Sequence, residues 1–301
     1  MHKTFLVTGG AGFIGTNLVE YLVGEGHKVI VVDDLSAGDS KRLPPEVQFH
    51  KLDIRDTKAL TELCVGVDIL VHLAALPQTQ FSIDEPILSH DVNVNGTLSV
   101  LEAVRQAGVK RVVYAASAGA YGDQSVTRLS TDLRAHPKTP YALHKYIGEE
   151  YMRLWSELFG IETISLRFFN AYGPHLDPDG AYALVIGRFL KQASEKQPLT
   201  VTGDGTQTRD FIHVSDIARA IEKAALSDKI GKGEVLNIGS GVQTTINEVA
   251  NLISSDIIYV PARIEIRYTE ADIDKTVELL GWHPTVVLAD GLADLKKEFG
   301  L

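Results

Sequence analysis

Three side chains have the types and spacing that proton transfer requires. Tyr141 and Lys145 are four residues apart in a segment with helical spacing, so they lie on one face of that helix. A lysine ammonium beside a phenol stabilises the phenolate and lowers the pKa of the phenol. Ser117 follows the apolar run Arg111–Ala116, and its hydroxyl can share the proton. We therefore predict an acid–base site of Ser117, Tyr141 and Lys145, with His144 at the surface or in packing contacts.

A tyrosine four residues before a lysine is usually a surface pair, so this hypothesis depends on a second motif. Gly10-Ala11-Gly12-Phe13-Ile14-Gly15 fits G-x-G-x-x-G between a predicted strand, Thr4–Val7, and a predicted helix, Asn17–Val23. Glycine lets the backbone approach a pyrophosphate, which then faces the N–H groups at the helix start. The next predicted strand, Lys28–Val32, ends at Asp33, whose carboxylate accepts ribose hydroxyls and repels a 2′-phosphate. The motif predicts a dinucleotide site, and Asp33 predicts NAD rather than NADP.

Strands and helices alternate through the first half of the chain. The hydrophobic pattern predicts further strands at Val47–His50, Ile69–Leu73, Arg111–Ala116, Thr163–Phe168 and Val235–Ile238, and helices at Thr57–Cys64, Asn93–Ala107 and Tyr141–Phe159. This alternation predicts an α/β fold with a doubly wound parallel sheet of the Rossmann type, in which ligands bind beyond the carboxyl ends of the strands.

The pattern loosens after Asn170, where glycine, proline and aspartate gather in loops. We therefore assign residues 1–170 to a NAD-binding Rossmann domain, with a returning segment near 211–240. Residues 171–210 and 241–301 are assigned to a smaller, interleaved C-terminal substrate-binding lobe.

Composition and charge argue against several classes of partner. The 301 residues are 45% hydrophobic and 23% charged, which is ordinary for a globular protein. A net charge of −10 argues against nucleic acid, which is bound by lysine and arginine patches. No apolar run reaches the roughly 18 residues of a membrane span, and the chain begins in a strand without a signal peptide. With a single cysteine, Cys64, we expect a cytoplasmic protein with no disulfide, membrane contact or metal site.

Ten segments spread along the chain carry a more specific pattern. They are Thr8–Gly15, Asp33–Ser36, Leu52–Ile54, His72–Ala75, Asn93–Thr97, Ser117–Gly122, Pro140–Lys145, Arg167–Asn170, Gly203–Phe211 and Leu280–Pro284. With these segments, essentially the whole chain resembles an extended short-chain dehydrogenase/reductase. Within that family it is similar to a nucleotide-sugar 4-epimerase of the UDP-glucose and UDP-N-acetylglucosamine type.

The resemblance implies a set of contacts to NAD. The glycine-rich turn would line the pyrophosphate, Asp33 would hold the adenosine ribose, and Asp53 would contact adenine. Lys145 would also bond the nicotinamide ribose. The implied cofactor residues are Gly9, Gly12, Phe13, Ile14, Asp33, Asp34, Leu35, Ser36, Gly38, Asp53, Ile54, Leu73, Ala74, Ala75, Asn93, Tyr141, Lys145 and Phe168.

The resemblance also implies contacts to a sugar nucleotide. The implied residues are Ser117, Tyr141, Asn170, Val185, Arg209, Arg263 and Thr269. Asn170, Arg209 and Arg263 match positions that hold the diphosphate, and the guanidinium fork suits phosphate; the alternative for both arginines is a surface ion pair. The segment Pro261–Glu265 is one residue shorter than the family pattern. Thr202 replaces an aromatic residue that is common near the base, so the diphosphate contact is better indicated than a uracil contact.

Two positions after Ser117 discriminate between related reactions. Related 4,6-dehydratases and decarboxylases place acidic residues there, whereas this chain has Ala118 and Gly119, which cannot act as acid or base. This favours epimerisation of a UDP-hexose at C4, in which Tyr141 takes the 4-hydroxyl proton and hydride moves to NAD and back to the other face of the 4-keto sugar. Another nucleotide-sugar epimerase or reductase remains an alternative, as does a non-catalytic NAD-binding regulator.

Two further expectations concern assembly and the sugar. The resemblance implies a homodimer that pairs helices near Asn93–Ala107 and Tyr141–Phe159, although Met152 and Trp155 can equally pack inside one subunit. Thr269 aligns with a position that limits the space around the C2 substituent. A small residue there admits an N-acetyl group, but a shift of one residue would place Tyr268 at that position. We therefore predict that UDP-N-acetylglucosamine and UDP-N-acetylgalactosamine are accepted alongside UDP-glucose and UDP-galactose, although the sequence alone does not decide the hexose.

Overall fold

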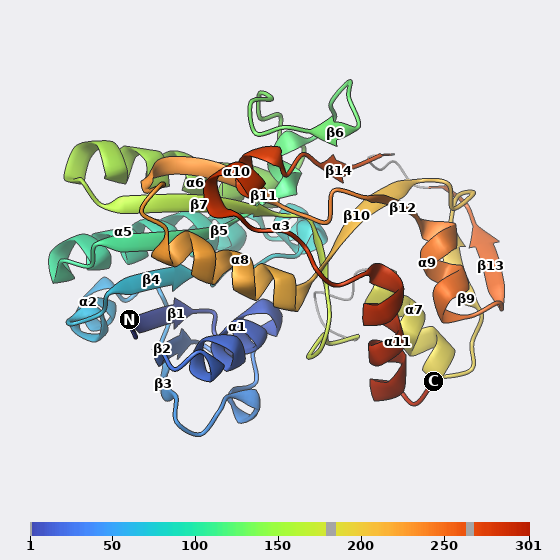
Figure 1. Ribbon diagram of the computed structural model, residues 1–301, viewed down its shortest axis with the longest axis horizontal. Helices are drawn as coiled ribbons and strands as arrows, with labels where there is room; N and C mark the ends of the chain where they lie inside the picture. Colours follow the sequence, from blue (N-terminus) through green and yellow to red (C-terminus); the bar gives the residue numbers. More distant parts are fainter. Residues whose placement is uncertain (1, 179–184, 263–267) are drawn as a thin grey trace.

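The computed structural model describes residues 2–178, 185–262 and 268–301. A seven-stranded sheet forms its centre (Figure 1). Across the sheet the strands are β11 (Lys232–Ile238), β7 (Glu162–Phe168), β5 (Arg111–Ser117), β4 (Ile69–His72), β1 (Thr4–Thr8), β2 (Lys28–Asp33) and β3 (Gln48–Lys51). Every neighbouring pair is parallel. The chain builds outward from β1 in one direction and then from β4 in the other, so the order reverses between these two strands, which confirms the predicted fold class.

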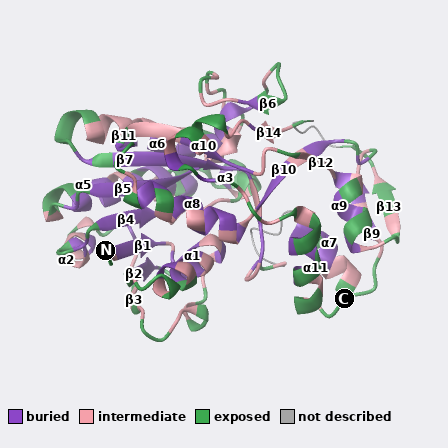
Figure 2. Cartoon of the chain, viewed as in Figure 1, coloured by how far each residue is buried: buried purple, intermediate pink, exposed green. Residues whose placement is uncertain are grey.

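The strands are apolar on both faces because helices cover both faces. Phe5 and Val7 of β1 contact the helices α1 (Phe13–Gly24) and α8 (Val214–Leu226), whereas Leu6 points to the opposite core. That second core contains α2 (Thr57–Cys64), α5 (Gly96–Ala107) and α6 (Pro140–Phe159). Figure 2 shows the result as buried strands beneath helices whose outer faces are exposed.

Short elements complete this part of the chain. The helices α3 (Thr79–Asp84) and α4 (Pro86–His90), followed by a π-helical turn at Asp91–Asn95, connect β4 to α5. Single turns of 3-10 helix lie at Ser40–Arg42 and Ala118–Tyr121. No helix within the described ranges is long and apolar enough to cross a membrane.

A smaller core lies at the other end of the molecule (Figure 1). Its helices are α7 (Val185–Ser194), α9 (Ile246–Ile253) and α11 (Leu288–Glu298), and its strands are β8 (Asn170–Tyr172), β9 (Leu199–Thr202), β10 (Thr208–His213), β12 (Gln243–Thr245) and β13 (Ile257–Val260). A two-residue strand, β6 (Arg128–Leu129), pairs with β14 (Glu270–Ala271). Both α8 and β11 return to the large sheet, and α10 (Asp274–Leu280) lies against them. The proposed limits of a substrate-binding lobe stay a prediction.

Element boundaries differ from the sequence expectations where capping decides them. The first helix begins at Phe13, directly after the glycine-rich turn, rather than at Asn17. The long helix begins at Pro140 because Thr139 accepts a hydrogen bond from the Ala142 N–H and proline needs no donor in the first turn. Ser117 is the last residue of β5 instead of following it.

Candidate active site

The glycines at Gly9 and Gly15 are explained by the backbone that approaches them closely. A Cβ on Gly9, where φ is +70°, would lie 2.6 Å from the Ala74 nitrogen, and a Cβ on Gly15 would lie 2.1 Å from the Gly9 oxygen. Gly12 caps α1 without a side-chain hydrogen bond, and a Cβ there would meet nothing closer than 3.4 Å. The first turn of α1 therefore presents N–H groups at the carboxyl end of β1, where an anion is favoured.

A cleft runs from this turn along the ends of β1, β2 and β4. Most of the predicted cofactor residues line it, namely Gly9, Gly12, Asp33, Asp34, Ser36, Gly38, Asp53, Ile54, Leu73, Ala74 and Ala75. Leu35 and Asn93 do not line it but hold residues that do. The Leu35 N–H donates to an Asp33 oxygen over 2.8 Å, and the Asn93 side chain bonds both the N–H and the carbonyl of Leu76, at 2.7 and 2.9 Å.

Asp33 is almost fully buried at the end of β2. One carboxylate oxygen accepts from the Ala11 N–H at 3.0 Å and the other from Leu35, so the carboxylate bridges β2 to the glycine-rich turn. Burial raises the pKa of Asp33, while these two hydrogen bonds lower it. Each oxygen keeps a further lone pair for a ligand hydroxyl.

Arg55 holds the carboxylate at the other end of the cleft, and sequence reasoning missed it. Its Nε lies 3.0 Å from both oxygens of Asp53, and its Nη1 lies 2.5 Å from Asp91. The hydrogen bonds and the positive charge of Arg55 lower the pKa of Asp53, so the Asp53 carboxylate stays ionised. Arg55 stands two residues after Asp53, which is the available sequence signal.

A cavity of about 460 Å³ adjoins the cleft, and Leu73 and Ala75 line both. Ser117 enters this cavity from the end of β5, while Tyr141 and Lys145 enter from the first turns of α6. Phe13, Ile14, Phe168 and Asn170 line it as well. The structure therefore brings together the three residues predicted for proton transfer, although 24 positions separate Ser117 from Tyr141.

Burial controls the acidity of Tyr141 and Lys145. It raises the pKa of Tyr141 to about 12, and a hydrogen bond with the Ser117 hydroxyl acts in the opposite direction. It lowers the pKa of Lys145 to about 7, while the nearby Glu149 carboxylate raises it. The expectation that Lys145 lowers the pKa of Tyr141 is wrong for this structure. Both groups are withdrawn from water, which disfavours their charged forms, and the Lys145 ammonium donates to the Ala115 carbonyl at 2.8 Å.

A buried ion pair lies beside Lys145, and sequence reasoning missed it. Glu149 follows Lys145 by one helical turn, and its two oxygens accept from Arg167 of β7 at 2.8 and 2.7 Å. The Arg167 guanidinium lies 4.4 Å from the centre of the Tyr121 ring. The spacing of Glu149 from Lys145 on one helix face is the signal that was available.

His144 is not at the surface. It is buried, its ring packs edge-on against His90 at 5.2 Å, and burial lowers its pKa to about 4. Of the two expected positions, surface or packing, the structure shows packing, because α4 covers this face of α6.

The predicted substrate residues lie on separate segments. Asn170 lines the cavity and donates to the Asp210 carbonyl at 3.0 Å. Arg209 precedes Asp210 on β10 and donates to the Thr208 carbonyl at 2.8 Å. Val185 begins α7, and the Thr269 hydroxyl beside β14 is buried and has no hydrogen-bond partner among the described residues. Arg263 lies outside the described residues.

Comparison with known proteins agrees with this geometry. A profile of the NAD-dependent epimerase/dehydratase family matches residues 5–239. The UDP-glucose 4-epimerase of Mycolicibacterium smegmatis is 35% identical over 96% of each chain. A Thermotoga maritima UDP-glucose 4-epimerase with UDP-glucose superposes with a TM-score of 0.93 at 33% identity, over 99% of this chain and 98% of that one. A Methanobrevibacter ruminantium UDP-N-acetylglucosamine 4-epimerase, in complex with UDP-N-acetylmuramic acid, gives 0.94 at 30% identity over the same shares. With its sheet, its glycine-rich turn and these relatives, the chain belongs to the NAD-dependent epimerase/dehydratase family.

Proposed function

We propose that the protein epimerises a UDP-hexose at C4 through a transient 4-keto sugar, with NAD as its cofactor. The family name covers both epimerases and dehydratases, so the lining of the active-site cavity must decide between them. The described residues that line the cavity of about 460 Å³ include Ser117, Tyr141 and Lys145 but no aspartate or glutamate. Elimination needs an additional acid or base, whereas exchange of one proton and one hydride does not. This lining is the observation that carries the proposal.

The cleft fits the adenosine diphosphate half of NAD. The uncapped first turn of α1 and the glycine-rich turn would hold the pyrophosphate, and Asp33 would accept hydrogen bonds from the ribose. Asp53 and Ile54 would border adenine, and Lys145 would bond the other ribose. Bound NAD supplies the acceptor and donor of hydride.

The side chains of this protein would move and hold the proton. Tyr141 takes it from the sugar 4-hydroxyl and returns it after the keto sugar has turned, while Ser117 shares the hydrogen bond. Burial disfavours the phenolate and the hydrogen bond with the Ser117 hydroxyl favours it, so this step depends on Ser117. In its ammonium form Lys145 would donate to the nicotinamide ribose, and burial lowers the pKa of this group to about 7.

We assign sugar-nucleotide binding to Asn170, Val185, Arg209, Arg263 and Thr269. Thr269 is the more sheltered of two adjacent candidates for the C2 gate, because Tyr268 is 40% exposed. A small gate residue leaves space for an N-acetyl group. We therefore propose that UDP-N-acetylglucosamine and UDP-N-acetylgalactosamine are accepted, alongside UDP-glucose and UDP-galactose.

We also propose a homodimer that works in the cytoplasm. Met152 of α6 is fully buried within the subunit and is unavailable for pairing, but Leu143 and Leu158 on α6 and Ile87 on α4 are exposed apolar side chains. Light scattering at micromolar concentration tests the dimer, and a monomer would refute it. The one cysteine, Cys64, is buried, so the fold needs no oxidising compartment.

The decisive experiment incubates the purified protein with a panel of sugar nucleotides and follows the products by NMR without added cofactor. We expect interconversion of the C4 epimers, because an epimerase recycles bound NAD. Turnover that consumes NAD in proportion to product would instead identify a dehydrogenase or reductase. No turnover of any sugar nucleotide would identify a non-catalytic NAD-binding protein.

A further inference from the structure

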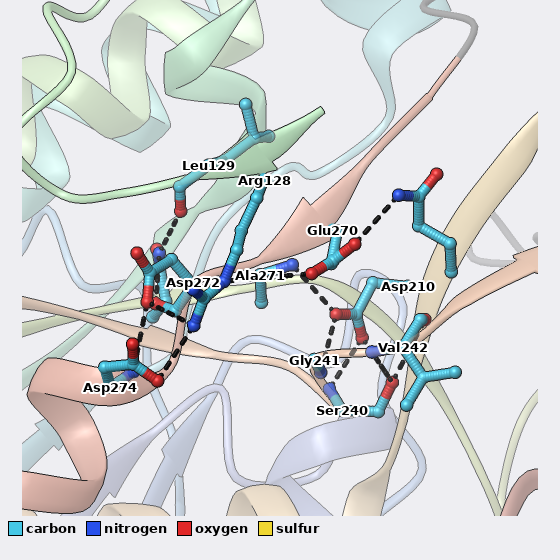
Figure 3. A network of polar contacts seen from close by, with 12 residues as sticks. Arg128, Leu129, Asp210, Ser240, Gly241, Val242, Glu270, Ala271, Asp272 and Asp274 are labelled. Carbon is cyan, nitrogen blue, oxygen red and sulfur yellow. Dashed lines mark hydrogen bonds and ion pairs between the residues drawn. The ribbon is translucent and has the colours of Figure 1, made fainter. Parts of the chain in front are cut away.

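The carboxylate of Asp210, on β10, joins three segments of the chain. The side chain is fully buried. One of its oxygens accepts from the N–H and the hydroxyl of Ser240, at 2.6 and 2.8 Å, and the other accepts from the N–H groups of Gly241 and Ala271, both at 2.9 Å (Figure 3). None of these donors carries a positive charge. The carboxylate is therefore held by oriented donors instead of an ion pair.

Two of the three segments that meet at the Asp210 carboxylate, β10 and the segment before β14, carry the predicted substrate contacts Arg209 and Thr269. Its backbone carbonyl accepts from the Asn170 side chain at 3.0 Å, and Arg209 is its neighbour on β10. Ala271, which donates to its carboxylate, stands two residues after Thr269. Asp210 thus contacts, or stands next to, the segments that carry Asn170, Arg209 and Thr269.

The strand β14 depends on side-chain contacts to hold its position, because its own strand pairing is short. It is two residues long and pairs only with the equally short β6 in the described structure. The Asn237 side chain donates to the Leu129 and Asp272 carbonyls at the ends of this pair, at 2.6 and 3.0 Å. On the outside, Arg128 forms ion pairs with Asp272 and Asp274, but its side chain is 49% exposed (Figure 3). Within the described ranges, β14 is joined to β10 by the buried hydrogen bond from the Ala271 N–H to the Asp210 carboxylate.

Close packing around this carboxylate leaves little freedom. A Cβ on Gly239 would lie 2.5 Å from the Ala271 side chain and 3.0 Å from an Asp210 oxygen. The turn after β11, β14 and β10 are therefore in mutual contact, and a change in the bonds of Asp210 moves the segments against one another.

We propose that Asp210 is a positioning residue for the sugar-nucleotide site. Its carboxylate fixes the strand that carries Arg209 against the segment that carries Thr269. The inference rests on the proposed function. Because Ser117, Tyr141 and Lys145 stand on β5 and α6, loss of the Asp210 bonds weakens substrate binding and leaves the chemical step largely intact.

The test replaces Asp210 by asparagine in the full-length protein. The amide keeps the shape of the side chain. Its NH₂ group, however, must face at least one main-chain N–H that donates to the carboxylate in the wild type, and two donors cannot form a hydrogen bond with each other. We expect the KM for UDP-glucose and the Kd for UDP to rise about tenfold or more. We expect kcat to stay within about threefold and the Kd for NAD within about twofold of wild type.

The control variant is Arg128→Ala, which removes the exposed ion pairs of the same short strands. Exposed pairs contribute little, so we expect its KM to stay within about twofold of wild type. If Asp210→Asn does not fold, Ser240→Ala replaces it. That change removes the hydroxyl bond to Asp210 at 2.8 Å and the longer contacts of the same hydroxyl with the Val242 N–H and carbonyl, and it leaves the three main-chain bonds of the carboxylate in place. We expect this variant to raise KM about threefold with kcat preserved.

Three results overturn the proposal. They are an unchanged KM in Asp210→Asn or its substitute, an equal rise of KM in Arg128→Ala, and a parallel loss of kcat, UDP affinity and NAD affinity that indicates a merely structural role. Failure of the proposed function looks different. In that case the wild type itself turns over no UDP-hexose, and the comparison of UDP affinities still decides the role of Asp210.

Discussion

Removing one partner of the buried Glu149–Arg167 pair should destabilise the protein far more than removing both. The side chains are 2% and 4% exposed and share two hydrogen bonds of 2.8 and 2.7 Å. Arg167→Met would leave the Glu149 carboxylate buried without its counter-charge, which costs about 3–5 kcal/mol. Typical domains are stable by only about 5–15 kcal/mol, so this change removes a large part of the total.

The double variant Glu149→Leu with Arg167→Met supplies the comparison. Apolar side chains of similar volume often replace a buried ion pair at little cost, so we expect it to lie within about 2 kcal/mol of wild type. The double-mutant cycle should then show a coupling of at least about 1–3 kcal/mol between the two positions. Urea unfolding followed by circular dichroism measures it, after coincident transitions have been checked with tryptophan fluorescence.

The same pair predicts a change in pH dependence. Burial lowers the pKa of Lys145 to about 7, and the Glu149 carboxylate raises it. Besides Glu149, the titratable groups near the Lys145 ammonium are His72 of β4, Tyr114 of β5 and Tyr141 of α6. Glu149→Gln removes the raising charge, so the ammonium is lost at a lower pH. We expect the alkaline limb of kcat/KM to move to lower pH.

Glu150→Gln is the matched control for this pH prediction. Glu150 is the next residue on α6, but its side chain is 45% exposed and pairs with Arg153 at the surface. Its profile should superimpose on that of wild type. A loss below about 1 kcal/mol in Arg167→Met, or an unshifted pH profile in Glu149→Gln, would refute the argument from burial.

Three further predictions concern the proposed roles directly. Tyr141→Phe should keep the fold and NAD binding but lose about 10²–10⁴-fold in turnover, and near-normal activity would refute its role. Asp33→Ala should weaken NAD binding in calorimetry, since each charge-assisted hydrogen bond contributes about 1.5–3 kcal/mol; equal binding of NAD and NADP by the wild type would contradict the assignment. Thr269→Tyr should lower kcat/KM for N-acetylated relative to plain UDP-hexoses, and an unchanged ratio means that Thr269 is not the gate.

Local features of the sequence were sufficient for the framework of this protein. The apolar strands, the glycine-rich turn and the placement of Tyr141 and Lys145 on one helix face follow from spacing over a few residues. These signals are local because strand and helix periodicities are local. They predicted the sheet, the glycine-rich turn and Asp33, whereas most other residues that line the cleft were implied by the resemblance to the family.

The tertiary structure alone decided which distant residues meet and how their charges behave. Asn170, Asp210 and Ala271 come together through strand pairing that no short pattern encodes. The raised pKa of Tyr141 reversed an expectation because desolvation depends on everything packed around a group, and the same packing decided that His144 is buried. Spacing along a helix predicts which side chains share a face. The elements that cover this face determine whether water reaches those side chains.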